Sequence, residues 1–206
     1  PSSVIASSSS ALLPSSFALG LAGSRRCLVA HQSNPPHLIP AVEIVPSPQT
    51  APEAVAMTRS LLAAIGQKPV VLRREIEGFV MNRLQGALLD EAFSLVGRGY
   101  ASVEDIDTAM RDGLGRRWAF MGPFETIDLN APGGVAAFIE RYGPAYAEIG
   151  RERPGREVWN TDLAETVVAA RRAALPESDL PARRAWRDAR LAKMAVEARS
   201  FDEKEM

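Results

Sequence analysis

Residues 27–45 read CLVAHQSNPPHLIPAVEIV and contain two short apolar runs separated by a proline-containing segment. Short apolar runs bounded by turn-forming residues are typical of buried strands. We therefore predict one strand over Cys27–Ala30 and a second over Ala41–Val45. A pair of buried strands indicates a sheet with packed faces, and the segments around it have to supply its other elements.

The residues on either side of these two strands continue the same pattern. Before the two strands, we predict a strand at Val4–Ala6 and a short helix at Ser15–Leu21. After them, we predict a longer helix at Ala51–Ile65 and a last strand at Pro69–Leu72. The longer helix is predicted to be capped by Thr50, with Pro52 in its first turn, and to end at Gly66. The order strand, helix, strand, strand, helix, strand is typical of the end of an α/β sheet. Four short strands are few for an independent sheet, so we expect further strands from elsewhere.

From Gly78 onward the pattern changes to helices only, which predicts an all-α helical domain after the α/β sheet. A long helix is predicted from Phe79 to about Val96, with apolar residues on two faces, as suits a helix in a core or a dimer interface. Ser102 with Asp105 resembles the capping box that opens a helix. Further helices are predicted to begin near Pro123, Gly134, Pro144, Glu157 and Pro181.

Composition and charge limit the classes of partner. With 206 residues, 46% of them hydrophobic, the chain is long enough to bury a core. A formal net charge of −1 gives no broad basic surface, so neither nucleic acid nor an anionic membrane is expected as a partner. The apolar N-terminal stretch lacks the positive charges of a signal peptide and is interrupted by Pro14. The single cysteine, Cys27, excludes an internal disulfide and favours a reducing, cytoplasmic compartment.

Several motifs that bind metals or nucleotides are absent from the sequence. It contains no HExxH and no paired CxxC spacing, so no metal site is predicted. It contains neither a P-loop nor the glycine-rich GxGxxG fingerprint that binds dinucleotides. This last absence constrains the function most.

His31 is the first candidate for chemistry, because it directly follows the predicted strand Cys27–Ala30. Proteins with α/β sheets bind ligands at the carboxyl ends of their strands, and an imidazole exchanges a proton near neutral pH. Glu43, on the next predicted strand, could orient that imidazole and stabilise its charged form. The alternative is that a single histidine beside a strand is structural, and spacing alone favours this alternative.

Asn82 and the serine run Ser7–Ser10 are the other polar candidates. Asn82 lies on an apolar face of the predicted long helix, where a buried amide needs either a ligand or a neighbouring loop as partner. The serines follow the first predicted strand and offer hydroxyl groups at the same sheet edge as His31. They are equally suited to a solvated turn and a helix cap.

Together these residues resemble the 3-hydroxyacyl-CoA dehydrogenase family. The resemblance is carried by ASSSS at 6–10, HQSNPPHLIPAVEIVPSPQT at 31–50 and EGFVMNRLQGALLDEA at 77–92, which contain the serine loop, His-x-x-Asn-Pro, the next-strand Glu and Gly-Phe-x-x-Asn-Arg. Two later stretches, GLGRRWAFMGPFETIDLNAPGG at 113–134 and ARRAWRD at 182–188, are similar to the lambda-crystallin branch, whose members include L-gulonate 3-dehydrogenase. The resemblance covers about residues 3–190.

The resemblance implies an NAD-dependent dehydrogenase that oxidises a 3-hydroxy acid, either L-gulonate or a 3-hydroxyacyl-CoA, to the 3-keto product. It makes His31 the general base that takes the hydroxyl proton as hydride leaves for NAD, and Glu43 the residue that orients and charge-pairs with His31. It makes Ser10, Asn34 and Asn82 the residues that hold the substrate oxygen and neighbouring groups.

The resemblance also implies a domain organisation and an assembly. Residues 1–75 would be the C-terminal part of a Rossmann-type NAD-binding sheet, 76–196 a helical domain for substrate binding and dimerisation, and 197–206 a frayed tail. The glycine-rich loop and ribose-binding acid of this family are expected to precede Pro1, so the cofactor-binding residues are expected mainly there. A homodimer is expected. The second hypothesis is a non-catalytic, crystallin-like structural or dimerisation module, which the missing glycine-rich loop favours for the isolated chain.

Overall fold

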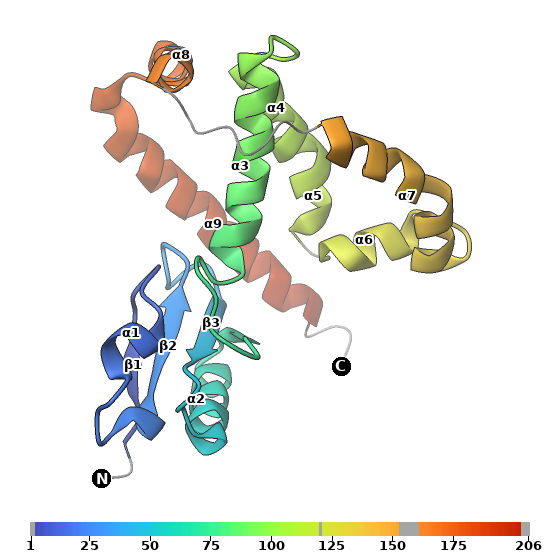
Figure 1. Cartoon of the computed structure of the whole chain (residues 1–206). Helices are drawn as coiled ribbons and strands as arrows, with labels where there is room; N and C mark the ends of the chain where they lie inside the picture. Colours follow the sequence, from blue (N-terminus) through green and yellow to red (C-terminus); the bar gives the residue numbers. More distant parts are fainter. Residues whose placement is uncertain (1–2, 120, 153–160, 203–206) are drawn as a thin grey trace. The chain divides into compact units, whose positions relative to one another are not determined.

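The computed structural model describes residues 3–119, 121–152 and 161–202 (Figure 1). The chain divides into two compact units, one made of Pro1–Gly86 with Ser178–Met206 and the other of Ala87–Glu177. Each unit is considered by itself.

The first unit contains a four-stranded mixed sheet with the order β1-β2-β3-β4. The two middle strands are antiparallel, whereas β1 pairs with β2 and β3 with β4 in parallel. The elements are β1 (Ile5–Ser7), α1 (Pro14–Ala18), a 3₁₀ turn (Ser24–Arg26), β2 (Cys27–Gln32), β3 (Ala41–Pro46), α2 (Pro52–Ala64) and β4 (Lys68–Val71). The predicted order of strands and helices is confirmed, with strand ends shifted by one or two residues.

Each face of the sheet has its own buried cluster. Side chains alternate between the two faces along a strand, so neighbouring residues of β2 and β3 contribute to different clusters. On one face, Leu28, Val42, Ile44 and Leu62 of α2 form a cluster, and Figure 1 shows α2 beside the strands. The opposite face has a second cluster, Val29, Val45, Leu72 and Phe79. This second face is the one that carries His31 and Glu43, two positions along the strands from Val29 and Val45.

The start of α2 differs from the prediction, because Thr50 is not its cap. Ala51 is the N-cap residue, it makes no side-chain cap, and Pro52 opens the helix. The Thr50 hydroxyl instead donates to the carbonyl oxygen of Cys27 at 2.7 Å and accepts from the amide of Ser47 at 2.8 Å. The Thr50 hydroxyl therefore hydrogen-bonds to a buried carbonyl at the start of β2 and does not cap the helix that follows it.

A tight turn precedes the long helix α3 (Met81–Gly97) and contains two consecutive residues with positive φ. These are Gly78 at +74° and Phe79 at +51°, and Phe79 is the one non-glycine residue with positive φ in the described part of the chain. Phe79 is fully buried in the second cluster. Since a side chain disfavours this backbone region, the turn depends on Gly78.

Gly78→Ala is therefore expected to lower the free energy of unfolding by about 1–2 kcal/mol, which urea denaturation would measure. Gly86→Ala is the matched control, because Gly86 lies inside α3 and an added methyl would meet nothing within 4 Å. It is expected to raise the stability, by up to about 1 kcal/mol, since alanine favours helices. Equal effects of the two substitutions would contradict the role given to the turn.

The second unit and the C-terminal segment are helical. After α3, the chain forms α4 (Val103–Thr108), a π-helical turn (Ala109–Leu114), α5 (Gly115–Trp118), α6 (Pro123–Leu129), α7 (Gly134–Glu152), α8 (Thr161–Ala174), a 3₁₀ turn (Glu177–Asp179) and α9 (Leu180–Asp202). The predicted class, an α/β sheet followed by helices, is confirmed. The helix predicted near Glu157 would begin outside the described residues.

One helix prediction in this part was wrong. Pro144 does not begin a helix, because it lies inside α7. Apolar residues at helical spacing continue on both sides of it, from Ile139 to Ile149, so the helix persists although one backbone hydrogen bond is lost. The frayed tail predicted over 197–206 stays a prediction: residues 197–202 belong to α9, and residues 203–206 lie outside the described residues.

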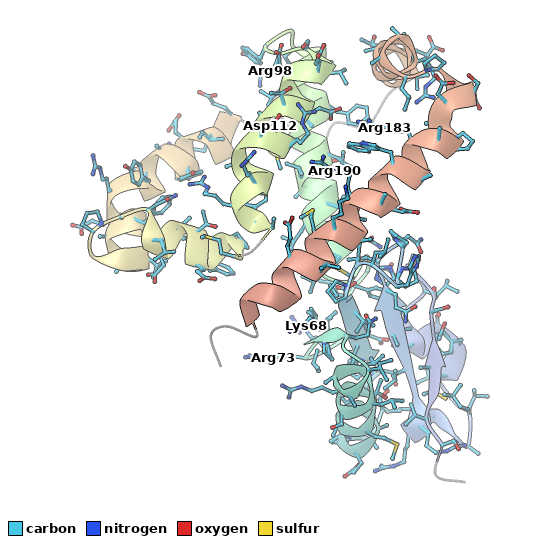
Figure 2. All side chains as sticks on the ribbon, turned by 180° about the vertical axis from the view of Figure 1, so that it is seen from behind. Lys68, Arg73, Arg98, Asp112, Arg183 and Arg190 are labelled. Carbon is cyan, nitrogen blue, oxygen red and sulfur yellow. The ribbon has the colours of Figure 1, made fainter. Side chains whose placement is uncertain are left out.

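Two arginines of α9 lie against one tryptophan. The guanidinium carbons of Arg183 and Arg190, both labelled in Figure 2, are 3.6 and 5.5 Å from the ring centroid of Trp186. Positions three and four residues apart share one face of a helix, which explains the contact. Cation–π contacts with Trp186 therefore hold both guanidinium groups against its ring.

The predicted capping box at the start of α4 is confirmed. The Ser102 hydroxyl accepts from the Asp105 amide at 3.1 Å, and the Asp105 carboxylate accepts from the Ser102 hydroxyl and amide at 2.6 and 3.3 Å. The Ser102 hydroxyl, and secondly its amide, lower the pKa of Asp105 below 3.8. A lowered folded-state pKa means that this stabilisation is present above the unfolded pKa and is lost as the pH falls through the folded pKa.

Asp105→Asn is accordingly expected to lower the melting temperature at about pH 6 and to have a smaller effect as the pH falls below 3.8. Thermal denaturation of both proteins, followed at about pH 6 and again at a pH below the ordinary pKa of an aspartate, checks the prediction. Asp107→Asn, on the same helix but outside the box, is the control. An Asp105→Asn effect that does not change with pH would show that the capping carboxylate is not responsible.

Candidate active site

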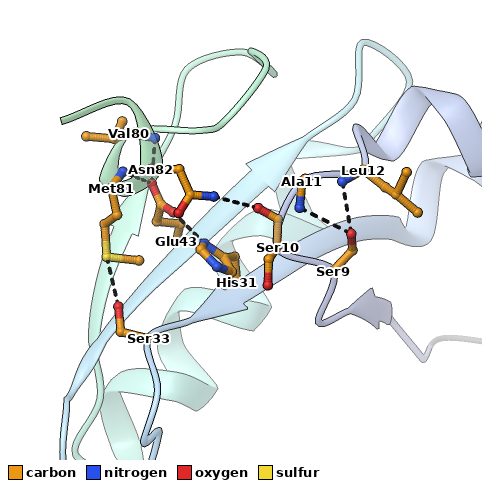
Figure 3. A network of polar contacts seen from close by, with 10 residues as sticks. All are labelled: Ser9, Ser10, Ala11, Leu12, His31, Ser33, Glu43, Val80, Met81 and Asn82. Atoms are coloured by element: carbon orange, nitrogen blue, oxygen red, sulfur yellow. Dashed lines mark hydrogen bonds and ion pairs between the residues drawn. The ribbon is translucent and has the colours of Figure 1, made fainter. Parts of the chain in front are cut away.

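The antiparallel pairing of β2 and β3 places His31 directly opposite Glu43. Directly opposed residues of an antiparallel pair extend from the same face of the sheet with their Cβ atoms close together. The His31 Nδ1 lies 2.7 Å from the Glu43 Oε2, as Figure 3 shows. The histidine keeps an exposed fraction of 6%, whereas the glutamate is completely buried.

The start of α3 holds the other oxygen of Glu43. Its Oε1 accepts from the backbone amides of Val80 and Met81, at 2.7 and 3.0 Å (Figure 3). The first amides of a helix lack partners within the helix and carry a partial positive charge, so they favour an anion. A buried carboxylate needs such compensation. The helix start therefore supplies two hydrogen-bond donors to the buried Glu43 carboxylate.

This arrangement decides which nitrogen of His31 is available. An ionised carboxylate only accepts hydrogen bonds, so the hydrogen of the neutral imidazole lies on Nδ1, between His31 and Glu43. Nε2 then carries the lone pair and can accept a proton. It makes no hydrogen bond within the described part of the chain. The two side chains therefore have the geometry that a base and its orienting carboxylate need.

Asn82 links the helix to the serine loop. Its Nδ2 donates to the carbonyl oxygen of Ser10 at 2.8 Å (Figure 3). One of the two partners considered for this amide, a neighbouring loop, is therefore present. Asn82 directly follows Met81, whose amide binds Glu43, so Ser10, His31, Glu43 and Asn82 are brought together at one end of the sheet.

The serines of the loop have different surroundings. The Ser7 hydroxyl accepts from the amide of Ser9 at 3.2 Å, and the Ser9 hydroxyl accepts from the amides of Ala11 and Leu12 at 3.4 and 2.9 Å. These two serines build the turn. Ser8 and Ser10 are both exposed, and neither hydroxyl makes a hydrogen bond to a described residue. Of these two, Ser10 is the serine whose carbonyl oxygen accepts from Asn82.

Asn34 is not brought into this network. It lies in the loop after β2, is exposed, and precedes Pro35 in a cis peptide bond. Its side chain makes no hydrogen bond with the residues that the structure describes. The neighbouring Ser33 is tied to α3, because its hydroxyl lies 3.3 Å from the Met81 sulfur.

Sequence reasoning missed three groups at the site: the amides of Val80 and Met81 and the ring of Phe79. The Phe79 and His31 ring centroids are 5.5 Å apart, at an interplanar angle of 55°. Backbone amides have no signature in residue identity. The one available signal was the glycine at Gly78, which marks a turn before the helix.

No cluster of three or more histidine, cysteine, aspartate or glutamate side chains in the described residues could hold a metal ion. The helices of the described part include none that is long and apolar enough to span a bilayer.

Two family models match the chain. Residues 1–76 match the family model "3-hydroxyacyl-CoA dehydrogenase, NAD binding domain", and residues 78–179 match the corresponding C-terminal domain. The chain belongs to the 3-hydroxyacyl-CoA dehydrogenase family. The predicted resemblance is therefore confirmed.

Two relatives show how similar the chain is to individual proteins. It is 45% identical to the lambda-crystallin homolog of Bos taurus over 93% of this chain and 60% of that protein. It is 43% identical to an L-carnitine dehydrogenase of Pseudomonas over 70% of this chain and 46% of that protein. The chain therefore spans about 60% of the length of its lambda-crystallin relative.

A solved structure has the same fold. It is the 5-formyl-3-hydroxy-2-methylpyridine 4-carboxylic acid 5-dehydrogenase, described as an NAD⁺-dependent dismutase. The TM-score is 0.79 at 29% identity, over 94% of this chain and 62% of that one. The sheet and the helical part of this chain thus each have a counterpart in a longer dehydrogenase.

Proposed function

We propose that this chain supplies the proton-transfer residues and the helical domain of an NAD-dependent dehydrogenase that oxidises a 3-hydroxy acid to the 3-keto product. The observation that carries the proposal is the pairing of His31 with Glu43 at 2.7 Å, in which Nε2 makes no hydrogen bond to any residue that the structure describes. When bound, NAD would accept the hydride from the carbinol carbon. The residues that bind its pyrophosphate are proposed to lie outside this chain, because the sequence has no glycine-rich fingerprint.

The proposed role of His31 is to remove the hydroxyl proton. A carbinol carbon gives up hydride readily only if its O–H proton leaves in the same step, since a protonated ketone would otherwise form. Nε2 takes this proton, and the buried Glu43 carboxylate stabilises the resulting imidazolium. The proton balance is complete: the hydroxyl oxygen becomes the keto oxygen, and the proton rests on His31.

Ser10, Asn34 and Asn82 are proposed to hold the substrate. Asn82 and Ser10 are supported by their place beside His31, with the Asn82 amide fixed on the Ser10 carbonyl oxygen at 2.8 Å. Asn34 is supported by its motif alone, three residues after His31. Hydrogen-bond donors at the substrate oxygen would stabilise the charge that develops on it.

The substrate is proposed to be a small 3-hydroxy acid such as L-gulonate, with a 3-hydroxyacyl-CoA as the second candidate. The lambda-crystallin likeness, which extends over 93% of the chain, supports the small acid. The family model supports the acyl-CoA. L-carnitine, the substrate named for the Pseudomonas relative, is added to the trial set because it carries a hydroxyl group at the same position from its carboxylate.

The test uses a complemented enzyme, in which this chain is joined to the part of the bovine lambda-crystallin homolog that the chain does not span. NADH formation is followed at 340 nm, roughly the nicotinamide absorption maximum, with L-gulonate, L-carnitine and 3-hydroxybutyryl-CoA in parallel. Turnover of one of these substrates is expected, and the preferred one names the substrate class. A folded complemented enzyme that turns over none of them would overturn the proposal and leave the non-catalytic, crystallin-like module.

We further propose that the protein is a cytoplasmic homodimer. The apolar face of α7 supports dimerisation, since Ile139 and Tyr146 on it are 60% and 61% exposed. The single buried thiol of Cys27 supports a reducing compartment. Sedimentation velocity of the complemented enzyme, with a monomer as the contradicting result, tests the assembly.

A further inference from the structure

Phe79 occupies an unusual backbone conformation at a place where it touches the proposed base. Its φ of +51° lies in the left-handed region, which large side chains avoid. The side chain is completely buried, and its ring contacts the imidazole of His31 at a centroid distance of 5.5 Å. Other members of the same cluster, such as Leu72 and Val45, fill the core without this backbone conformation.

The conformation places three groups at once. Because Gly78 and Phe79 both have positive φ, the chain reverses directly before α3. The ring of Phe79 then packs beside His31, and the next two amides, those of Val80 and Met81, donate to Glu43. One turn of the chain thus contacts both members of the pair.

The imidazole needs this second contact. The hydrogen bond from Nδ1 to Glu43 holds one ring atom, but the ring can still turn about its Cβ–Cγ bond as far as this single hydrogen bond allows. Such a rotation would move Nε2, the atom that takes the proton. A ring packed at 55° against one side of the imidazole limits that rotation.

We infer that Phe79 is a positioning residue: its buried ring fixes the plane of His31 so that Nε2 faces the substrate hydroxyl. This inference rests on the proposed function. Because the Phe79 side chain is completely buried, it acts through its contact with His31. Its substitution should therefore affect the proton-transfer step and leave substrate binding almost unchanged.

Phe79→Leu in the complemented enzyme tests the inference, because leucine stays apolar and removes the ring. We expect kcat to fall roughly 10- to 100-fold, as small misplacements of a reacting group do, while KM changes by less than about 3-fold. Leu72→Ala is the control, since Leu72 belongs to the same cluster without a ring contact to His31. It is expected to lower the melting temperature with kcat unchanged.

Repeating the substitution in a His31→Gln background separates positioning from a general effect. If Phe79 acts through His31, then Phe79→Leu should cause no further loss of kcat in that background. An equal loss in both backgrounds, or an unchanged kcat with His31 present, would overturn the inference. Phe79→Met replaces Phe79→Leu if the leucine variant does not fold, because methionine adapts to irregular space.

A spectroscopic measurement keeps the inference separate from the proposed function. In the ¹⁵N-histidine-labelled chain, the imidazole resonances of His31 report its tautomer and its mobility. Phe79→Leu is expected to broaden these resonances or to mix the tautomers, and Leu72→Ala is not. Unchanged resonances would overturn the positioning role even if the complemented enzyme is active. An inactive complemented enzyme with the expected spectral change would overturn only the proposed function.

Discussion

His31→Gln is expected to lower kcat of the complemented enzyme roughly 10²- to 10⁴-fold, the range over which a general base contributes. Glutamine fills similar space and can accept the hydrogen bond of a substrate hydroxyl, but it cannot take its proton at neutral pH. The substrate should still bind, so KM should change far less than kcat. Initial rates of NADH formation over a range of substrate concentrations would measure both constants.

The chain contains a matched control for this substitution, because His37 is its second histidine and is exposed in the loop after β2. His37→Gln is expected to leave kcat unchanged. The melting temperatures of both variants should stay close to that of the parent protein, which would exclude unfolding as the cause. An active His31→Gln variant would remove His31 from the reaction and return it to the structural role that spacing alone favoured.

Substitutions of Glu43 are expected to affect activity and stability to different extents. The two oxygens of this buried carboxylate accept from His31, Val80 and Met81. In Glu43→Gln, the oxygen of the amide has to face the two backbone amides, so its NH₂ group faces Nδ1 of His31. That geometry moves the imidazole hydrogen to Nε2, and the base is lost. We expect kcat to fall roughly 10²- to 10⁴-fold in this variant, because an orienting carboxylate of this kind fixes the tautomer.

Glu43→Ala removes both acceptor oxygens, leaves the donors of His31, Val80 and Met81 without a partner, and creates a buried cavity. Its free energy of unfolding is expected to fall by about 3–5 kcal/mol, because each buried donor left unsatisfied costs about 1–3 kcal/mol. Glu43→Gln should lose less, about 1–3 kcal/mol, since it keeps an acceptor for the helix amides. Urea denaturation of both variants would measure the two values.

Glu75→Gln is the control for these variants. The Glu75 carboxylate also accepts a backbone amide near a helix start, that of Ser15 at 2.9 Å, but it has no contact with His31. Its substitution should change stability little and kcat not at all. If Glu43→Gln behaved in the same way, the carboxylate would have no part in orienting the base.

Local patterns in the sequence were sufficient wherever a structure depends on neighbouring residues. The apolar runs around Cys27–Ala30 and Ala41–Val45 predicted both middle strands, and Ser102 with Asp105 predicted the start of α4. Such features are encoded within a few residues, by alternation, helical spacing and cap chemistry. The same local reasoning was wrong for Thr50 and Pro144. The Thr50 hydroxyl donates a hydrogen bond to Cys27, which is distant in the sequence. Pro144 lies inside a helix whose apolar face continues on both sides of the proline, beyond the few residues that local reasoning considers.

The sequence by itself therefore determined the order of the elements, the motifs that assign the family and the identities of His31 and Glu43 as candidates. Only the tertiary structure decided that these two residues lie opposite each other, because strand register depends on pairing across the sheet. It also decided that the amides of Val80 and Met81 hold Glu43, and that Phe79 packs beside His31. These contacts join residues that are distant in the sequence, so local patterns do not predict them. The turn with two positive φ angles brings the residues together.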